Sequence, residues 1–237
     1  MPKWLVRLKG EKFDLEDLPS LLRLPELSVI EEDSYYYLQS SEFDSLTSED
    51  EVFKRGVELI KTVNEVAKLY RDNFCDVAED RVTLIEDDGR RRHYIYLVDN
   101  VTGRSKVSAT INVTTPDASQ PAVNRHSPLE SFVYLSQKHK PVAVALHFYH
   151  EDSWVNLYKV YETIRDDVGG EHVIIKNDWV SKSELNRFTQ TAQSIEALGD
   201  QARHASKKYQ KPDVPMSHNE AKSLVKSILM KWLATKS

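Results

Sequence analysis

Four Ser-x-x-Glu segments that each stand directly before an apolar stripe constrain this chain more than any other feature. In such a capping box the serine oxygen accepts a hydrogen bond from an unpaired backbone N–H at the start of a helix, and the glutamate reaches back to another. Apolar residues at helical spacing then indicate a helix that packs one face on a core. The four start signals are Ser48 with Glu51, Ser127 with Glu130, Ser181 with Glu184, and Ser217 with Glu220.

The first half of the chain also carries strand patterns. Residues 4–9 alternate apolar and charged side chains, which predicts a half-buried strand. Residues 27–38 predict one or two strands around a turn at 32–34, and 14–24 predict a short helix. Asp88-Gly89 joins the patterns at 81–87 and 93–99 as a hairpin, and Thr102-Gly103 leads to a further run at 105–114.

We therefore predict an α+β fold. A mixed region with a small antiparallel sheet and one long helix is expected over residues 1–115, and a mostly helical region over 126–237. The turn-rich stretch 116–121 marks the change between them. The apolar run 142–148 fits a strand or a helix by itself, and its helical neighbours favour a helix. The two regions could also pack as one unit.

The composition is that of an ordinary globular protein, with 40% hydrophobic and 29% charged residues. No run approaches the roughly 18 apolar residues that a membrane span needs, and residues 1–10 lack the core of a signal peptide. The lone Cys75 cannot form an internal disulfide, which favours a reducing compartment. We expect a cytoplasmic protein that does not enter a membrane.

Charge is distributed unevenly along the chain. Residues 1–117 carry 16 Lys and Arg against 24 Asp and Glu, whereas residues 118–237 carry 16 against 13. The extremes are residues 26–51, with nine acids and no base, and residues 187–237, with nine bases and four acids. Such a division fits two regions that attract each other, which we favour, or a basic end that meets an anionic partner.

The polar stretch between the last two helices is the first candidate site. If a helix restarts near residue 199, Asp200, Arg203, His204 and Lys207 share one face. A carboxylate one turn before a histidine orients its ring, which suits an anion contact or acid–base work. A solvent-facing ion pair is the simpler interpretation of the same spacing. The candidate contact residues are Asp200, Arg203, His204, Lys207 and Lys208.

Other chemistry-bearing patterns are weaker. His147 and His150 lie three residues apart before Glu151 and could hold part of a metal site. No further segment supplies the remaining ligands, so no metal is expected. The chain also lacks a glycine-rich phosphate loop, H-E-x-x-H and G-x-S-x-G, which disfavours the corresponding enzyme classes. We assign no catalytic residue and no cofactor.

Three successive tyrosines, Tyr35 to Tyr37, place aromatic rings on both faces of a strand. Aromatic rings on a sheet are used to stack nucleic-acid bases. The acids that surround these tyrosines in the sequence would repel phosphate, so we expect them to serve the core and an interface.

The spacing of Arg165 and His172 is similar to the Arg–His motif of HEPN ribonucleases, in which the polar residue next to the arginine is matched here by Asp166. That resemblance implies a metal-independent ribonuclease that acts through Arg165 and His172, or through Asp200 and His204. Gly169-Gly170 separates the first pair and would interrupt the helix that holds the motif in that family. The chain is therefore not assigned to this family.

The function expected from the sequence is that of an intracellular interaction protein without catalysis of its own. Its basic C-terminal helices would contact an acidic protein surface or nucleic acid. The HEPN-like ribonuclease is the alternative.

Overall fold

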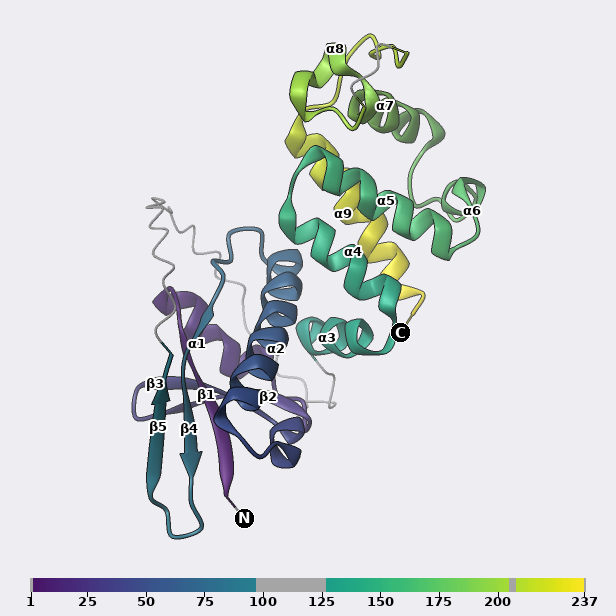
Figure 1. The fold of residues 1–237 in the computed structure, drawn as a ribbon. Coiled ribbons are helices and arrows are strands. Elements are labelled where there is room, and N and C mark those ends of the chain that lie inside the picture. Colours follow the sequence, from purple (N-terminus) through teal and green to yellow (C-terminus); the bar gives the residue numbers. More distant parts are fainter. Residues whose placement is uncertain (1, 97–126, 205–207, 237) are drawn as a thin grey trace, which may run out of the picture.

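The computed structural model describes residues 2–96, 127–204 and 208–236. The first region contains β1 (Lys3–Lys9), α1 (Lys12–Leu21), β2 (Leu27–Glu32), β3 (Tyr35–Ser40), the 3-10 turn η1 (Ser41–Ser45), α2 (Glu49–Tyr70), β4 (Ala78–Ile85) and β5 (Arg91–Ile95). The second contains α3 (Pro128–Lys138), α4 (Lys140–Glu151), α5 (Trp154–Asp167), α6 (Glu171–Lys176), α7 (Lys182–Gln193), α8 (Ile195–Leu198), the 3-10 turn η2 (Gly199–Gln201) and α9 (His218–Ala234). The predicted α+β class is confirmed (Figure 1).

Among the described residues the strands form one sheet in the order β2-β3-β1-β4-β5, and every neighbouring pair is antiparallel. The element order from β1 to β4 is β-α-β-β-α-β, with β1 and β3 in the middle of that four-stranded part. This is the split β-α-β arrangement of ferredoxin-like folds. The β4–β5 hairpin adds the edge strand, and its turn contains Gly89 at a φ of +83°, which suits glycine.

The alternation of side chains gives the sheet two different faces. Val6, Leu38 and Val82 are opposite one another in the register and face the helices, because a Cβ on Gly56 of α2 would lie 2.9 Å from Val6 Cγ2. Leu15 and Leu18 of α1 belong to the same buried cluster. Helices α1 and α2 therefore cover one face, and the other face begins with Leu5, Arg7 and their cross-strand partners.

Helix α2 begins at a complete Ser48–Glu51 capping box, as predicted. Near its N-terminus its buried residues form a stripe, but from Leu59 to Leu69 apolar and polar residues are buried on several sides. The reason is that α2 packs on the sheet with one side and on α3 and α4 with another (Figure 1). Buried Asn64 exchanges hydrogen bonds with the backbone of Val77 at 2.8 and 3.1 Å, which satisfies its amide there.

The second region is built around α4, α5 and α9 (Figure 1). All three of its predicted capping boxes are present, at the starts of α3, α7 and α9. The ambiguous run 142–148 lies within α4 and is helical as favoured. Helix α5 ends at Asp167, before Gly169 and Gly170, both of which have positive φ. A single cluster of buried apolar side chains includes residues of both regions.

The strand run 105–114, the Thr102-Gly103 turn and the break at 116–121 lie outside the described residues. Within the described ranges, none of the helices combines the length and the apolar character that a membrane crossing requires.

Candidate functional site

The predicted helical face after residue 199 is wrong. Gly199 has a φ of +57°, residues Gly199–Gln201 form a short 3-10 turn, and Ala202 is extended. A left-handed glycine followed by an extended residue turns the chain away from a helical path. Asp200, Arg203 and His204 therefore do not line up at helical spacing. Lys207 lies outside the described residues.

Arg203 is held from three directions. Its backbone N–H donates to the carbonyl of Ala192 at 2.9 Å, and its Nη2 donates to Glu162 Oε1 of α5 at 3.0 Å. The guanidinium lies over the ring of Tyr158, 4.4 Å from the centroid. A planar guanidinium suits both the carboxylate and the ring face, so Arg203 ties the segment after α8 to α5.

His204 lies beside Arg203. Its ring stacks on Tyr209 with centroids 4.9 Å apart and an angle of 18° between the planes. His204 Nε2 also lies 3.3 Å from Arg203 Nη1. Tyr158, Glu162, Arg203, His204 and Tyr209 thus form one group, which we call the α5 corner.

The electrostatics of the α5 corner are nearly balanced. Glu162 contacts Arg203 and also lies 3.9 Å from Arg165 Nη2. Burial raises the pKa of the Tyr158 hydroxyl, which accepts a hydrogen bond from Gln193 Nε2 at 3.1 Å and stays protonated at neutral pH. Because Tyr158 is buried, the corner offers only the half-buried rings of His204 and Tyr209 and a fixed guanidinium. Such groups can stack on a ligand ring and contact an anion.

Asp200 and Lys208 are the other two predicted contact residues that the structure describes. Asp200 lies in η2 and is exposed. Lys208 is exposed as well and directly precedes Tyr209. Tyr158 and Tyr209 were not predicted as site residues, because Tyr158 belongs to a plain apolar stripe and Tyr209 to a polar loop in the sequence.

Arg165 and His172 lie on different helices, α5 and α6, with Gly169-Gly170 between them. Arg165 contacts Asp166 at 2.7 Å and lies over the Tyr161 ring, whereas His172 is exposed. The structure thus directs Arg165 toward its own helix and does not bring it to His172 among the described contacts.

The two histidines of the possible metal motif turn to separate carboxylates. His147 Nδ1 lies 2.9 Å from Glu65 Oε1, and His150 Nε2 lies 3.0 Å from Asp76 Oδ1. Within residues 2–96, 127–204 and 208–236, no group of three or more His, Cys, Asp or Glu side chains is placed to hold a metal ion.

Many bases of the second region are paired with acids of this chain. Lys226 reaches Asp72 of the first region at 3.0 Å. Other pairs lie within the second region, among them Arg187 with Glu220, Lys222 with Asp152, and Lys236 with Asp167. Acids of the segment 26–51 instead pair within the first region, as Glu42 does with Arg55. Part of the unevenly distributed charge is therefore used in ion pairs within the chain.

Two shallow pockets adjoin the seam between the regions. One, of about 220 Å³, lies beside His150 and Asp76, and the other, of about 240 Å³, lies beside Tyr70 and Arg71. Some of their charged groups bond within the chain, as His150 does with Asp76 and Arg71 Nη1 does with Asp17 at 2.6 Å. Cys75, near the seam, is exposed.

Comparison with protein-family models, with curated proteins and with solved structures gave no match to this chain.

Proposed function

We propose that this protein is a non-enzymatic binding protein whose helical C-terminal region contacts an anionic partner at the α5 corner, and that the partner is single-stranded nucleic acid. The observation that carries the proposal is the stacking of His204 on Tyr209 next to the guanidinium of Arg203. Unpaired bases stack on aromatic and guanidinium planes, and phosphates are attracted by the same cation.

An acidic protein surface is the other anionic partner that the charge pattern favoured. Either partner would meet the charge of Arg203, which Glu162 already contacts, but a carboxylate gains nothing from the rings of His204 and Tyr209. A polynucleotide uses the planar groups as well as the charge. Nucleic acid is therefore the partner that fits the corner better.

Binding of a fluorescently labelled oligouridylate of about 12 nucleotides tests the proposal by anisotropy. His204→Ala and Tyr209→Ala are each expected to weaken binding about tenfold, since stacking of one base contributes about 1–3 kcal/mol. Tyr134→Ala and His172→Ala are matched controls, because Tyr134 and His172 are exposed on other helices. Equal affinity of all four variants would contradict the proposal, as would displacement by an acidic peptide but not by unlabelled RNA.

The same samples test the ribonuclease alternative. We expect the labelled oligouridylate to stay intact on a denaturing gel after long incubation without added metal. Cleavage by the wild type that His172→Ala or His204→Ala abolishes would favour the alternative and overturn the non-enzymatic assignment.

A further inference from the structure

Phe13, in the first turn of α1, is the most exposed large apolar side chain among the described residues, with 75% of its surface exposed. The buried apolar residues of this helix, Leu15 and Leu18, lie on its opposite side. Phe13 therefore adds nothing to the core of its own molecule. A single exposed ring is common on protein surfaces, so the groups around it decide whether it has a use.

The pocket of about 240 Å³ beside Tyr70 and Arg71 also adjoins α1, because Asp17 and Ser20 line it. Asp17 and Ser20 come four and seven residues after Phe13 in the same helix. This spacing places all three residues on one face of α1. The exposed ring and the pocket therefore lie next to each other on one surface of the molecule.

The lining of this pocket suits an uncharged ring. Ala67, Phe74 and Leu129 are buried and give it apolar walls. The charge of Arg71 is already balanced there, since its Nη1 donates to Asp17 at 2.6 Å. A cavity of about 150 Å³ can hold a benzene ring, so the pocket is large enough for one phenyl side chain.

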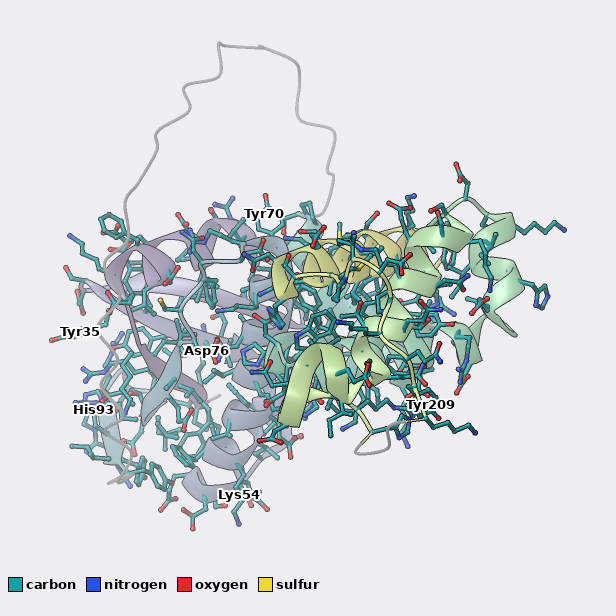
Figure 2. All side chains as sticks on the ribbon, turned by 90° about the horizontal axis from the view of Figure 1, so that it is seen from above. Tyr35, Lys54, Tyr70, Asp76, His93 and Tyr209 are labelled. Carbon is teal, nitrogen blue, oxygen red and sulfur yellow. The ribbon has the colours of Figure 1, made fainter. Side chains whose placement is uncertain are left out.

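Tyr70 extends the apolar surface around the pocket. It is the last residue of α2, lines the pocket and is 49% exposed. Figure 2 shows it at the outline of the molecule. Two exposed rings, those of Phe13 and Tyr70, thus lie beside one apolar pocket, which distinguishes this surface from apolar residues that are exposed singly.

A ring and a pocket on one helix face make the surface complementary to itself. In a dimer with a two-fold axis both copies use the same surface, so that residue i contacts j while j contacts i. An axis that crosses α1 near residues 16 and 17 sets the two copies of the helix antiparallel. Phe13 of each copy then lies opposite Ser20 of the partner subunit, at the pocket that Ser20 lines.

The charges on α1 are complementary in the same arrangement. Lys12 Nζ lies 3.6 Å from Glu16 Oε1 of its own helix, and both side chains are exposed. Antiparallel packing brings the two Glu16 carboxylates near the axis, with a Lys12 ammonium on either side of them. This group of four charges is neutral as a whole, which limits the repulsion between two chains that each have a net charge of −5.

We propose that two copies of this chain form a two-fold symmetric dimer through α1, in which Phe13 of each copy enters the pocket beside Ser20 and Tyr70 of the other. A second copy is the occupant that this surface fits, because it fills the pocket and covers the exposed Phe13 at the same time. A partner of another sequence that only filled the pocket would leave Phe13 in water. The surface is separate from the α5 corner, so the inference does not rest on the proposed function.

Sedimentation velocity of the full chain from about 1 µM to about 1 mM tests the dimer, since a contact built on one ring and one helix is at the weak end of protein interfaces. The wild type should pass from one copy to two and no further. Phe13→Ser removes the ring, and Ser20→Trp fills the pocket. Each is expected to weaken dimerisation about tenfold or more, because a ring buried at the centre of an interface carries much of its affinity.

A mixture of the two variants tests the fit of ring and pocket directly. Chains with Ser20→Trp keep the ring, and chains with Phe13→Ser keep the open pocket. An equimolar mixture should therefore associate more strongly than either variant by itself. A general loss of apolar surface would give no such recovery.

The chain offers a close control for each change. Val214 is 67% exposed in the second region, so Val214→Ser removes a similarly exposed apolar side chain away from α1. Ser223 is exposed on α9, so Ser223→Trp adds the same bulk to another helix. Both controls are expected to dimerise as the wild type does, and thermal unfolding verifies that all four variants are folded.

Three outcomes would overturn the inference. A wild type that stays at the mass of one copy up to about 1 mM would exclude a second copy as the occupant, whether the pocket then takes a different protein or none. A dimer that Phe13→Ser and Ser20→Trp leave intact would have its interface elsewhere. A mass that grows beyond two copies with concentration would indicate a head-to-tail contact in place of the two-fold one.

Discussion

Glu65 of α2 and His147 of α4 meet where the two regions pack, with Glu65 Oε1 2.9 Å from His147 Nδ1. Burial raises the pKa of the Glu65 carboxyl, and the bond to His147 opposes that rise. One helical turn further, His150 lies 3.0 Å from Asp76, and this bond raises the pKa of the His150 imidazole. The seam between the regions therefore contains two histidine–carboxylate pairs.

Replacing His150 by glutamine is expected to make the free energy of unfolding less dependent on pH. A histidine whose pKa is raised on folding contributes stability that is fully present below its unfolded pKa, about 6.5. That stability is lost as pH rises through the higher folded value. The difference in unfolding free energy between wild type and His150→Gln should therefore be largest near about pH 6 and shrink toward about pH 8.

Urea unfolding across that pH range measures the difference. His172→Gln is the control, because His172 is exposed on α6. A difference in unfolding free energy between wild type and His150→Gln that is constant, or that grows with pH, would show that the bond to Asp76 does not raise the pKa of His150 on folding.

Gly56→Ala is expected to destabilise the protein, although alanine normally stabilises a helix interior by about 1 kcal/mol relative to glycine. A Cβ at residue 56 would lie 2.9 Å from Val6 Cγ2 in the core. Relief of that overlap should cost about 1–3 kcal/mol, more than the helix gains. Chemical unfolding of Gly56→Ala, Val6→Ala and the double variant tests this. The double variant should lose less than the two single losses together, and a more stable Gly56→Ala would contradict the prediction.

Ser127→Ala should cost more stability than Ser217→Ala, although both serines complete capping boxes. Loss of either cap costs about 1 kcal/mol. Ser127 Oγ also donates to the carbonyl of Leu21 in the first region, and loss of this bond should cost roughly 1 kcal/mol more. Its partner Glu130 accepts from the backbone N–H of Arg23 at 2.6 Å. Thermal unfolding of the two variants compares them, and equal losses would mean that the bond to Leu21 adds nothing.

Arg203→Lys is expected to destabilise the C-terminal region nearly as much as Arg203→Ala, by about 1 kcal/mol. Lysine keeps the charge but cannot lie flat on Tyr158 while it bonds Glu162. Hydrogen exchange of the amides around residue 203 and overall urea unfolding are the measurements. Wild-type stability of Arg203→Lys would reduce the role of Arg203 to charge alone.

Local signals in the sequence predicted the elements well. The four capping boxes and the Asp88-Gly89 turn act within a few residues, so their structures could be expected without knowledge of the rest of the chain. The predicted site required the chain to continue as a helix after Gly199. The positive φ of this one glycine ends the helix there, and the sequence around it does not reveal this. Which residues share a face of the sheet depends on the register between β1, β3 and β4, which are far apart in the sequence.

Because α2 is covered by the sheet on one side and by α3 and α4 on another, neither half of the chain is expected to be self-sufficient. A polypeptide that ends before α3 would leave Val66, Leu69 and their neighbours facing water. Separately produced halves should therefore aggregate alone and recover their secondary structure when mixed. If one half of this chain were replaced by the corresponding half of another protein, the fold should be kept only when the surface of α2 that contacts that half is kept as well.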